Sequence, residues 1–200
     1  MSLTSLAFSN LNLRRNPFGE MTRDERAAVA IVDLGDLAFQ IRQPGHAVQF
    51  LAPHGRGKTT NLIALHRHVP SWQFLRIFED SSPHFEGERA RLIDSFDKLP
   101  RRLRNSAYRT STSLGITTHI DLAREIRRAG YQVTTRVVRT VDAGKLSAIF
   151  QRRIEFVRRG PGPVPRLDAS RIAGLIETHG SDVRAMETEL YGLFESWRKR

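Results

Sequence analysis

The chain has 200 residues, 40% of them hydrophobic, which suits a single domain or one domain with a small appendage. No apolar run approaches the ~20 residues that span a bilayer, and the lack of cysteine excludes disulfides and thiolate metal sites. Its 32 lysines and arginines outnumber its 21 acidic residues, and the net charge of +11 favours polyanionic partners, nucleic acid before a membrane surface.

The N-terminal part predicts irregular chain followed by short helices. Residues 1–20 lack the pattern of an export signal and end in the turn residues Asn16-Pro17-Phe18-Gly19. Thr22 and Glu25 form a capping-box pattern, which predicts the start of an amphipathic helix. A second short helix is expected over 34–41. Without an export signal or cysteines, the chain is expected to be cytoplasmic.

A glycine-rich turn follows the first predicted strand, His46 to Leu51. It leads into a helix expected to run to about His68, and a strand–turn–helix with Gly-Lys-Thr is typical of a phosphate-binding loop. Backbone N–H groups would cradle a polyphosphate, Lys58 would neutralise its β and γ oxygens, and Thr59 would ligate Mg²⁺. The expected binding residues are Ala52, Pro53, His54, Gly55, Arg56, Gly57, Lys58, Thr59 and Thr60.

Strands and helices then alternate as far as residue 138. A helix carrying Phe96 and Leu103 is expected to bend near Pro100, and a helix over 120–129 should end at Gly130. Alternation of this kind argues for an α/β fold with a parallel sheet covered on both faces, here with five strands. The four later strands are predicted at 72–78, 90–94, 113–118 and 131–138.

The alternation ends after the fifth strand. A long basic helix is predicted over 141–159 and a stiff proline-glycine linker over 160–165. Two more helices follow, the first capped by Asp168 and the second by Ser181 or Asp182. The predicted domains are an irregular segment 1–20, a nucleotide-binding α/β domain 21–159 and a small all-α lid 160–200.

An acidic residue at the end of the third strand would complete the metal site. Asp94 closes the apolar run Leu92-Ile93, and a carboxylate there would hydrogen-bond Mg²⁺-bound water or the Thr59 hydroxyl. Thr59 and Asp94 are therefore the expected Mg²⁺ residues. The alternative is an ordinary polar residue at a strand end.

This order of motifs resembles the AAA+ family of P-loop ATPases, in its compact bacterial type related to origin-recognition and transposition ATPases. The resemblance extends from Asn16-Pro17-Phe18 to the C-terminal helices. It implies that the ligand is ATP with Mg²⁺. It also implies that Thr118, or failing it Thr117, is the sensor-1 side chain near the γ-phosphate or attacking water. By the same resemblance Arg184 would be sensor 2, the lid arginine that reaches over the γ-phosphate.

The acidic motif departs from the family. The family's motif ends Asp-Glu, and the glutamate polarises the attacking water, whereas Ser95 follows Asp94 here and cannot act as a base at neutral pH. Asp97 is the replacement available from the next helical turn. The expected catalytic set is thus Asp94, Asp97, Thr118 and Arg184, with ATP hydrolysis that is slow or completed by a partner.

The expected function is an ATP-driven switch with nucleic acid as a candidate target and a protein partner or homo-oligomer as a further one. The family resemblance also offers Arg127 and Arg128 as arginine-finger positions, although a solvated helix end explains them equally. The alternatives are a small-molecule phosphotransferase and a non-hydrolysing ATP-binding adaptor. The candidate polyanion-binding segments are Arg101-Arg102-Leu103-Arg104, Arg152-Arg153, Arg158-Arg159 and Arg198-Lys199-Arg200.

Overall fold

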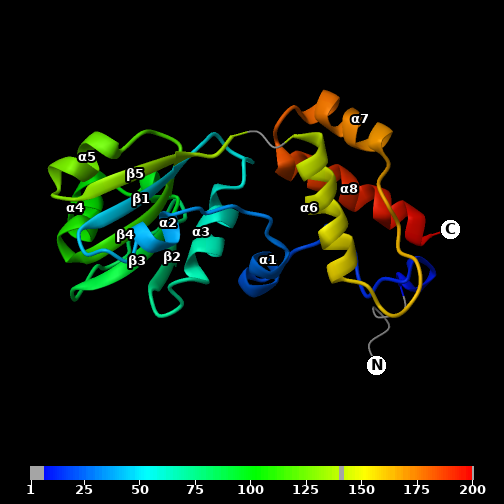
Figure 1. Cartoon of the computed structure of the whole chain (residues 1–200), viewed down its shortest axis with the longest axis horizontal. Coiled ribbons are helices and arrows are strands. Elements are labelled where there is room, and N and C mark those ends of the chain that lie inside the picture. The colour runs from blue at the N-terminus through cyan, green and yellow to red at the C-terminus, as the bar shows by residue number, and fades with distance from the viewer. Residues whose placement is uncertain (1–6, 140–141, 200) are drawn as a thin grey trace. The chain divides into compact units, whose positions relative to one another are not determined.

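The computed structural model describes residues 7–139 and 142–199, which fall into two compact units (Figure 1). The α/β unit is Val32–Arg139, and the helical unit combines the described residues of Met1–Ile31 and Thr140–Arg200. These bounds differ from the expected domains 21–159 and 160–200. The reason is that α6 (Ala143–Phe156) and the N-terminal segment bury their apolar side chains with the two C-terminal helices.

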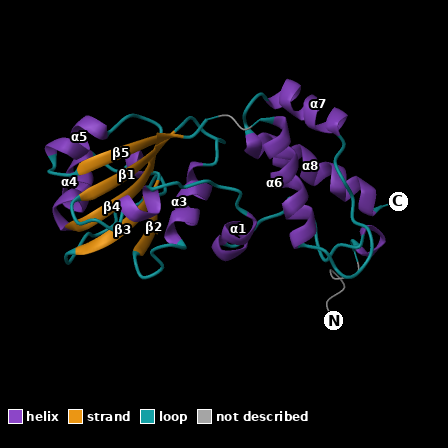
Figure 2. Ribbon diagram, in the orientation of Figure 1, coloured by secondary structure: helices purple, strands orange, loops and turns teal. Residues whose placement is uncertain are grey.

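The α/β unit is built on a five-stranded sheet in the order β2-β3-β4-β1-β5, in which every pairing is parallel (Figure 2). This confirms the predicted fold class and all five predicted strands. The central strands β1 and β4 are almost wholly buried, as is usual for parallel strands covered on both faces. The strands are β1 (His46–Leu51), β2 (Gln73–Arg76), β3 (Arg89–Asp94), β4 (Ser111–Thr118) and β5 (Gln132–Val137).

Helices cover both faces of this sheet. The helices α4 (Arg101–Thr110) and α5 (Ala123–Arg128) pack one core against it, with Phe96, Tyr108 and Ile126 among its buried side chains. On the other face α2 (Leu37–Gln40) and α3 (Lys58–His66) bury a second core, which holds Leu37, Leu62, Leu65, Val48 and Phe50. The expected bend at Pro100 is present, since a 3₁₀ turn, Phe96–Lys98, precedes it and α4 begins at the next residue.

The helical unit consists of α1 (Arg23–Val29), α6, α7 (Ala169–His179) and α8 (Val183–Arg198), together with the 3₁₀ turn Ser9–Leu11. The capping box is present: Glu25 N donates to Thr22 Oγ1 (3.2 Å) and Thr22 N donates to Glu25 Oε2 (2.9 Å). Asp168 and Asp182 cap α7 and α8 as predicted. None of the helices in the described stretches 7–139 and 142–199 has the length and apolar character that a membrane crossing requires.

The N-terminal segment is part of the core of the helical unit. Phe8, Leu13 and Phe18 are buried in one apolar cluster with side chains of α6, α7 and α8. The buried guanidinium of Arg153 donates to the carbonyls of Pro17 (3.0 Å) and Gly19 (3.2 Å). The segment predicted to be irregular thus carries little regular structure yet is fixed by burial and hydrogen bonds.

Candidate nucleotide site

The glycine-rich turn joins β1 to α3 within the α/β unit. Gly55 and Gly57 have φ angles of 74° and 82°, in the left-handed region that favours glycine, and Gly57 caps α3. The backbone N–H groups of Gly57, Lys58 and Thr59 find no acceptor among residues 7–139 and 142–199. A helix N-terminus with free N–H groups is suited to bind an anion.

Lys58 places a cation inside this turn. Its Nζ donates to the carbonyl oxygens of Ala52 and Pro53, both at 2.7 Å, and the residue is only 7% exposed. Burial lowers the pKa of Lys58, and the nearby carboxylates of Asp97 and Asp94 act in the opposite direction. The two carbonyl groups thus hold the Lys58 amine in place at the loop.

Asp94 is the centre of a hydrogen-bonded cluster at the carboxyl edge of the sheet. It is 1% exposed and accepts from the Thr59 hydroxyl at 3.0 Å (Oδ1) and 3.1 Å (Oδ2). Thr117 donates to Oδ1 at 2.6 Å, and Arg76 Nε lies 3.6 Å from Oδ2. A hydroxyl beside a carboxylate is the oxygen donor set that Mg²⁺ prefers, so Thr59 and Asp94 fit this ion.

The two threonines that end β4 have different partners. Thr117 connects Asp94 to the backbone of Ser95, whose N–H donates to its hydroxyl at 2.7 Å. The Thr118 hydroxyl donates to the Ile120 carbonyl at 2.7 Å and makes no hydrogen bond to Asp94. The reserve choice, Thr117, is thus the one that joins the cluster.

Asp97 is hydrogen-bonded to His119, which follows β4 at the same edge of the sheet. Its Oδ2 accepts from His119 Nδ1 at 2.9 Å, and the His119 ring stacks on His54 with centroids 3.8 Å apart. His54 is thus connected to a carboxylate indirectly. The link to Asp97 runs through His119, which directly follows β4 and which the motif analysis missed as a functional group.

Two arginines that concern the predicted site lie in different units, Arg76 in β2 and Arg184 in α8. Arg76 was missed, because its place opposite Asp94 follows from the pairing of β2 with β3, which the sequence does not state. Arg184 lies in α8 of the helical unit, exposed, with its N–H bonded to Asp182 Oδ1 at 3.0 Å. Its role as sensor 2 stays a prediction.

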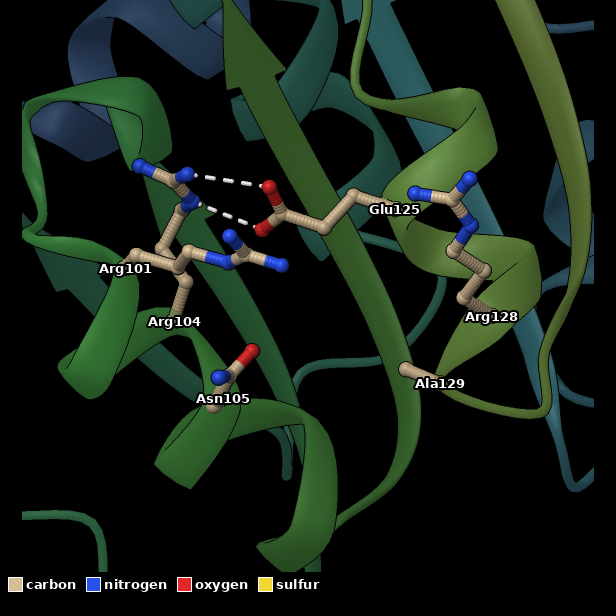
Figure 3. Close-up of a pocket in the computed structure, with 6 residues that line it drawn as sticks. All are labelled: Arg101, Arg104, Asn105, Glu125, Arg128 and Ala129. Carbon is tan, nitrogen blue, oxygen red and sulfur yellow. Dashed lines mark hydrogen bonds and ion pairs between the residues drawn. The ribbon is translucent and has the colours of Figure 1, made fainter.

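A basic pocket of about 430 Å³ lies between α4 and α5 (Figure 3). Arg104 holds Glu125 through Nε (2.8 Å) and Nη2 (2.9 Å), and this bidentate pair lowers the pKa of Glu125. The Arg101 and Arg128 side chains line the same pocket without a hydrogen bond or ion pair to the described residues. Two guanidinium groups placed in this way can bind an oxyanion by donating hydrogen bonds to it.

No family model and no curated protein matches the sequence. Among solved structures, NtrX from Brucella abortus is similar at a TM-score of 0.57 and 12% identity, over 88% of this chain and 54% of that one. NtrX in complex with ADP gives 0.51 and 15%, over 86% and 52%. Domain III of the Thermotoga maritima replication initiation protein DnaA gives 0.46 and 14%, over 88% and 99%, a score too low to carry an argument.

The chain thus spans about half the length of the NtrX structures. At such identities the likeness concerns the fold. The strand order and the likeness to the two NtrX structures confirm, at the level of the fold, the resemblance that the motifs implied. The chain has the fold of the AAA+ P-loop ATPases.

Proposed function

We propose that the chain binds ATP with Mg²⁺ at the turn between β1 and α3 and hydrolyses it slowly or under stimulation by a partner. The observation that carries the proposal is the hydrogen-bonded cluster of Thr59, Asp94 and Thr117 beside the buried Lys58. Oxygen donors suit Mg²⁺, and an ammonium with free N–H groups suits phosphates. The complex of NtrX with ADP supports a nucleotide as the ligand class.

The slow rate is proposed because of Ser95. A serine hydroxyl cannot take up a proton at neutral pH, and loss of a general base typically costs about 10²–10⁴-fold in rate. A switch further needs a group that distinguishes ATP from ADP. We assign this role to Arg184, which would contact the γ-phosphate of ATP. The proposed location of the protein is the cytoplasm.

Nucleotide binding is tested by thermal unfolding with and without Mg-ATP. At ATP a hundredfold above Kd, the native state should gain about 2.7 kcal/mol, or roughly 5–10 °C in Tm for a chain of this size. Lys58→Ala should abolish the gain, whereas Lys145→Ala, an exposed lysine of α6, should retain it. An equal gain in Lys58→Ala would contradict the proposal.

Hydrolysis is tested by steady-state phosphate release, with and without duplex DNA. Turnover that Lys58→Ala removes and DNA accelerates is the expected result for a DNA-linked ATPase. Binding of Mg-ATP without turnover in either condition would instead favour the second candidate, a non-hydrolysing adaptor, to which the serine at position 95 also points.

The basic pocket between α4 and α5 supports a polyanion as the proposed partner, with nucleic acid as the first candidate. A protein partner or a second copy of the chain is the alternative. Each phosphate contact contributes about −0.9 to the slope of log affinity against log salt. The double variant Arg101→Ala/Arg128→Ala should make the slope for duplex DNA less negative by roughly two. Arg124→Ala, on an exposed arginine of α5 that does not line the pocket, is the matched control.

A further inference from the structure

His119 is held in one orientation beside the phosphate loop. Its ring Nδ1 and its backbone N–H both donate to Asp97 Oδ2, at 2.9 and 3.3 Å. A carboxylate only accepts hydrogen bonds, so Nδ1 carries a hydrogen, and in the neutral imidazole Nε2 then holds a lone pair. Nε2 has no hydrogen bond to the described residues. The His119 ring also stacks on His54 of the glycine-rich turn, 29° from parallel.

Asp97 is itself incompletely bonded. Its Oδ1 is buried and has no hydrogen-bond partner in the described chain. Buried side-chain oxygens nearly always have one, and exceptions are found at functional sites. Asp97 is also the charge that most supports the protonated form of Lys58 against burial, so it lies within electrostatic reach of the loop.

Several other polar groups of this edge already have protein partners. Asp94 accepts from Thr59 and Thr117, and Thr118 is bound to Ile120. Ser95, at φ 63°, has its N–H fixed to Thr117. His119 Nε2 and Asp97 Oδ1, by contrast, have no hydrogen bond to the described residues.

We propose that His119, oriented by Asp97, activates the attacking water in place of the missing glutamate. The inference rests on the proposed ATP hydrolysis. The water oxygen forms a bond to the γ-phosphorus as the bond from that phosphorus to the β–γ bridging oxygen breaks, and ADP leaves with the electron pair. The water proton passes to His119 Nε2 and then to solvent. Asp97 is a positioning residue that acts through the imidazole.

The first test compares kcat and nucleotide affinity. His119→Ala should lower kcat for Mg-ATP by about 10²-fold, with Mg-ATP affinity from thermal shifts within threefold of the wild type. Added imidazole should restore part of the rate in this variant. Asp97→Asn, which keeps an oxygen acceptor for Nδ1, should lose less than Asp97→Ala. His68→Ala, an exposed histidine, is the control.

The second test needs no turnover. Calorimetry with Mg-ADP plus aluminium fluoride, a mimic of the transferring phosphoryl group, should show about tenfold weaker binding in His119→Ala, while Mg-ADP alone binds unchanged. Ser95→Glu introduced into His119→Ala should raise phosphate release, because it returns a carboxylate base to the position after Asp94.

The outcomes separate the two proposals. Wild-type turnover that His119→Ala leaves unchanged would overturn the role of His119 and leave the ATPase intact. Wild-type protein that binds Mg-ATP but releases no phosphate in any condition would overturn both hydrolysis and this role. Equal loss of Mg-ADP and Mg-ADP–aluminium fluoride binding would mean that His119 merely shapes the site.

Discussion

A buried charged side chain lies near each end of β3, and the two differ in how fully they are hydrogen-bonded. Near the amino end, Arg91 is 1% exposed, and its guanidinium donates to Gln73 Oε1 (3.0 Å), Ser111 Oγ (3.1 Å) and the carbonyls of Glu86 (2.7 Å) and Gly87 (2.9 Å). Burial lowers the pKa of Arg91, but Nε, Nη1 and Nη2 of its guanidinium all have hydrogen-bond acceptors. Beyond the carboxyl end, Asp97 keeps a buried oxygen without a partner.

The difference separates a structural ion from a site built for a ligand. A buried charge that only stabilises the fold is saturated with protein partners, because each open position has a desolvation cost. At the carboxyl edge, open acceptors coincide with backbone in the left-handed region at Gly55, Gly57 and Ser95. The left-handed backbone of Ser95, unfavourable for a residue with a side chain, and the unsatisfied groups together mark a functional edge.

Arg91→Met should have the largest effect on stability. The apolar side chain fills similar volume but leaves several buried carbonyls and hydroxyls unpaired, at a cost of about 3–5 kcal/mol in the free energy of unfolding. Urea unfolding monitored by circular dichroism measures it. Arg89→Met, on an exposed residue of the same strand, should change stability by less than about 0.5 kcal/mol.

Thr117→Val and Thr118→Val form a matched pair. Each removes two hydrogen bonds of a buried threonine hydroxyl and should cost about 1–3 kcal/mol. Only Thr117→Val should also weaken the Mg²⁺ dependence of ATP binding, since its hydroxyl helps to hold Asp94. Titration of Mg²⁺ against a fluorescent ATP analogue reads this out, and an Mg²⁺ defect confined to Thr118→Val would restore Thr118 as the sensor residue.

Asp97→Asn should change the free energy of unfolding by less than about 1 kcal/mol. The amide keeps an acceptor for His119 and removes a charge whose second oxygen is unpaired, so gain and loss offset each other. A loss as large as that of Arg91→Met in the same urea assay would show that Asp97 is a structural ion and would remove the contrast between the two ends of β3.

The smallest effect concerns pH. The neighbouring His119, burial and Lys58 all lower the pKa of His54 from its ordinary 6.5. In the unfolded chain His54 takes up its proton first as pH falls, so stability decreases below about pH 6.5 and levels off below the folded pKa. His54→Gln should flatten this part of the pH–stability curve, measured by thermal unfolding at constant ionic strength; a curve unchanged by the substitution would rule the contribution out.

Local motifs account for what the sequence could predict. Lys58 and Thr59 stand in a strand–turn–helix pattern, and Asp94 ends an apolar run, so neither assignment needed the strand order. The five strands follow from alternation with helices. Element boundaries shifted by a few residues where side chains intervened: α5 starts at Ala123, behind Asp121, whose carboxylate accepts from the Ala123 N–H.

Non-local pairing accounts for what it could not. Which of Thr117 and Thr118 meets Asp94 depends on the pleat and pairing of β4, and a shift of one residue reverses the answer. The Asp97–His119 bond joins turns after two different strands. Residues 8–18 pack with α6, α7 and α8, from which they are separated in sequence by the whole α/β unit. No local sequence pattern encodes such a long-range contact.

The helical unit is made from both sides of the α/β unit in sequence, and this affects the order of folding during synthesis. Phe8, Leu13 and Phe18 leave the ribosome before Val32–Arg139, and their partners in α6, α7 and α8 leave after it. The α/β unit can fold while these apolar side chains are still unmatched. We therefore expect the nascent N-terminal segment to be a binding site for chaperones until α8 has emerged.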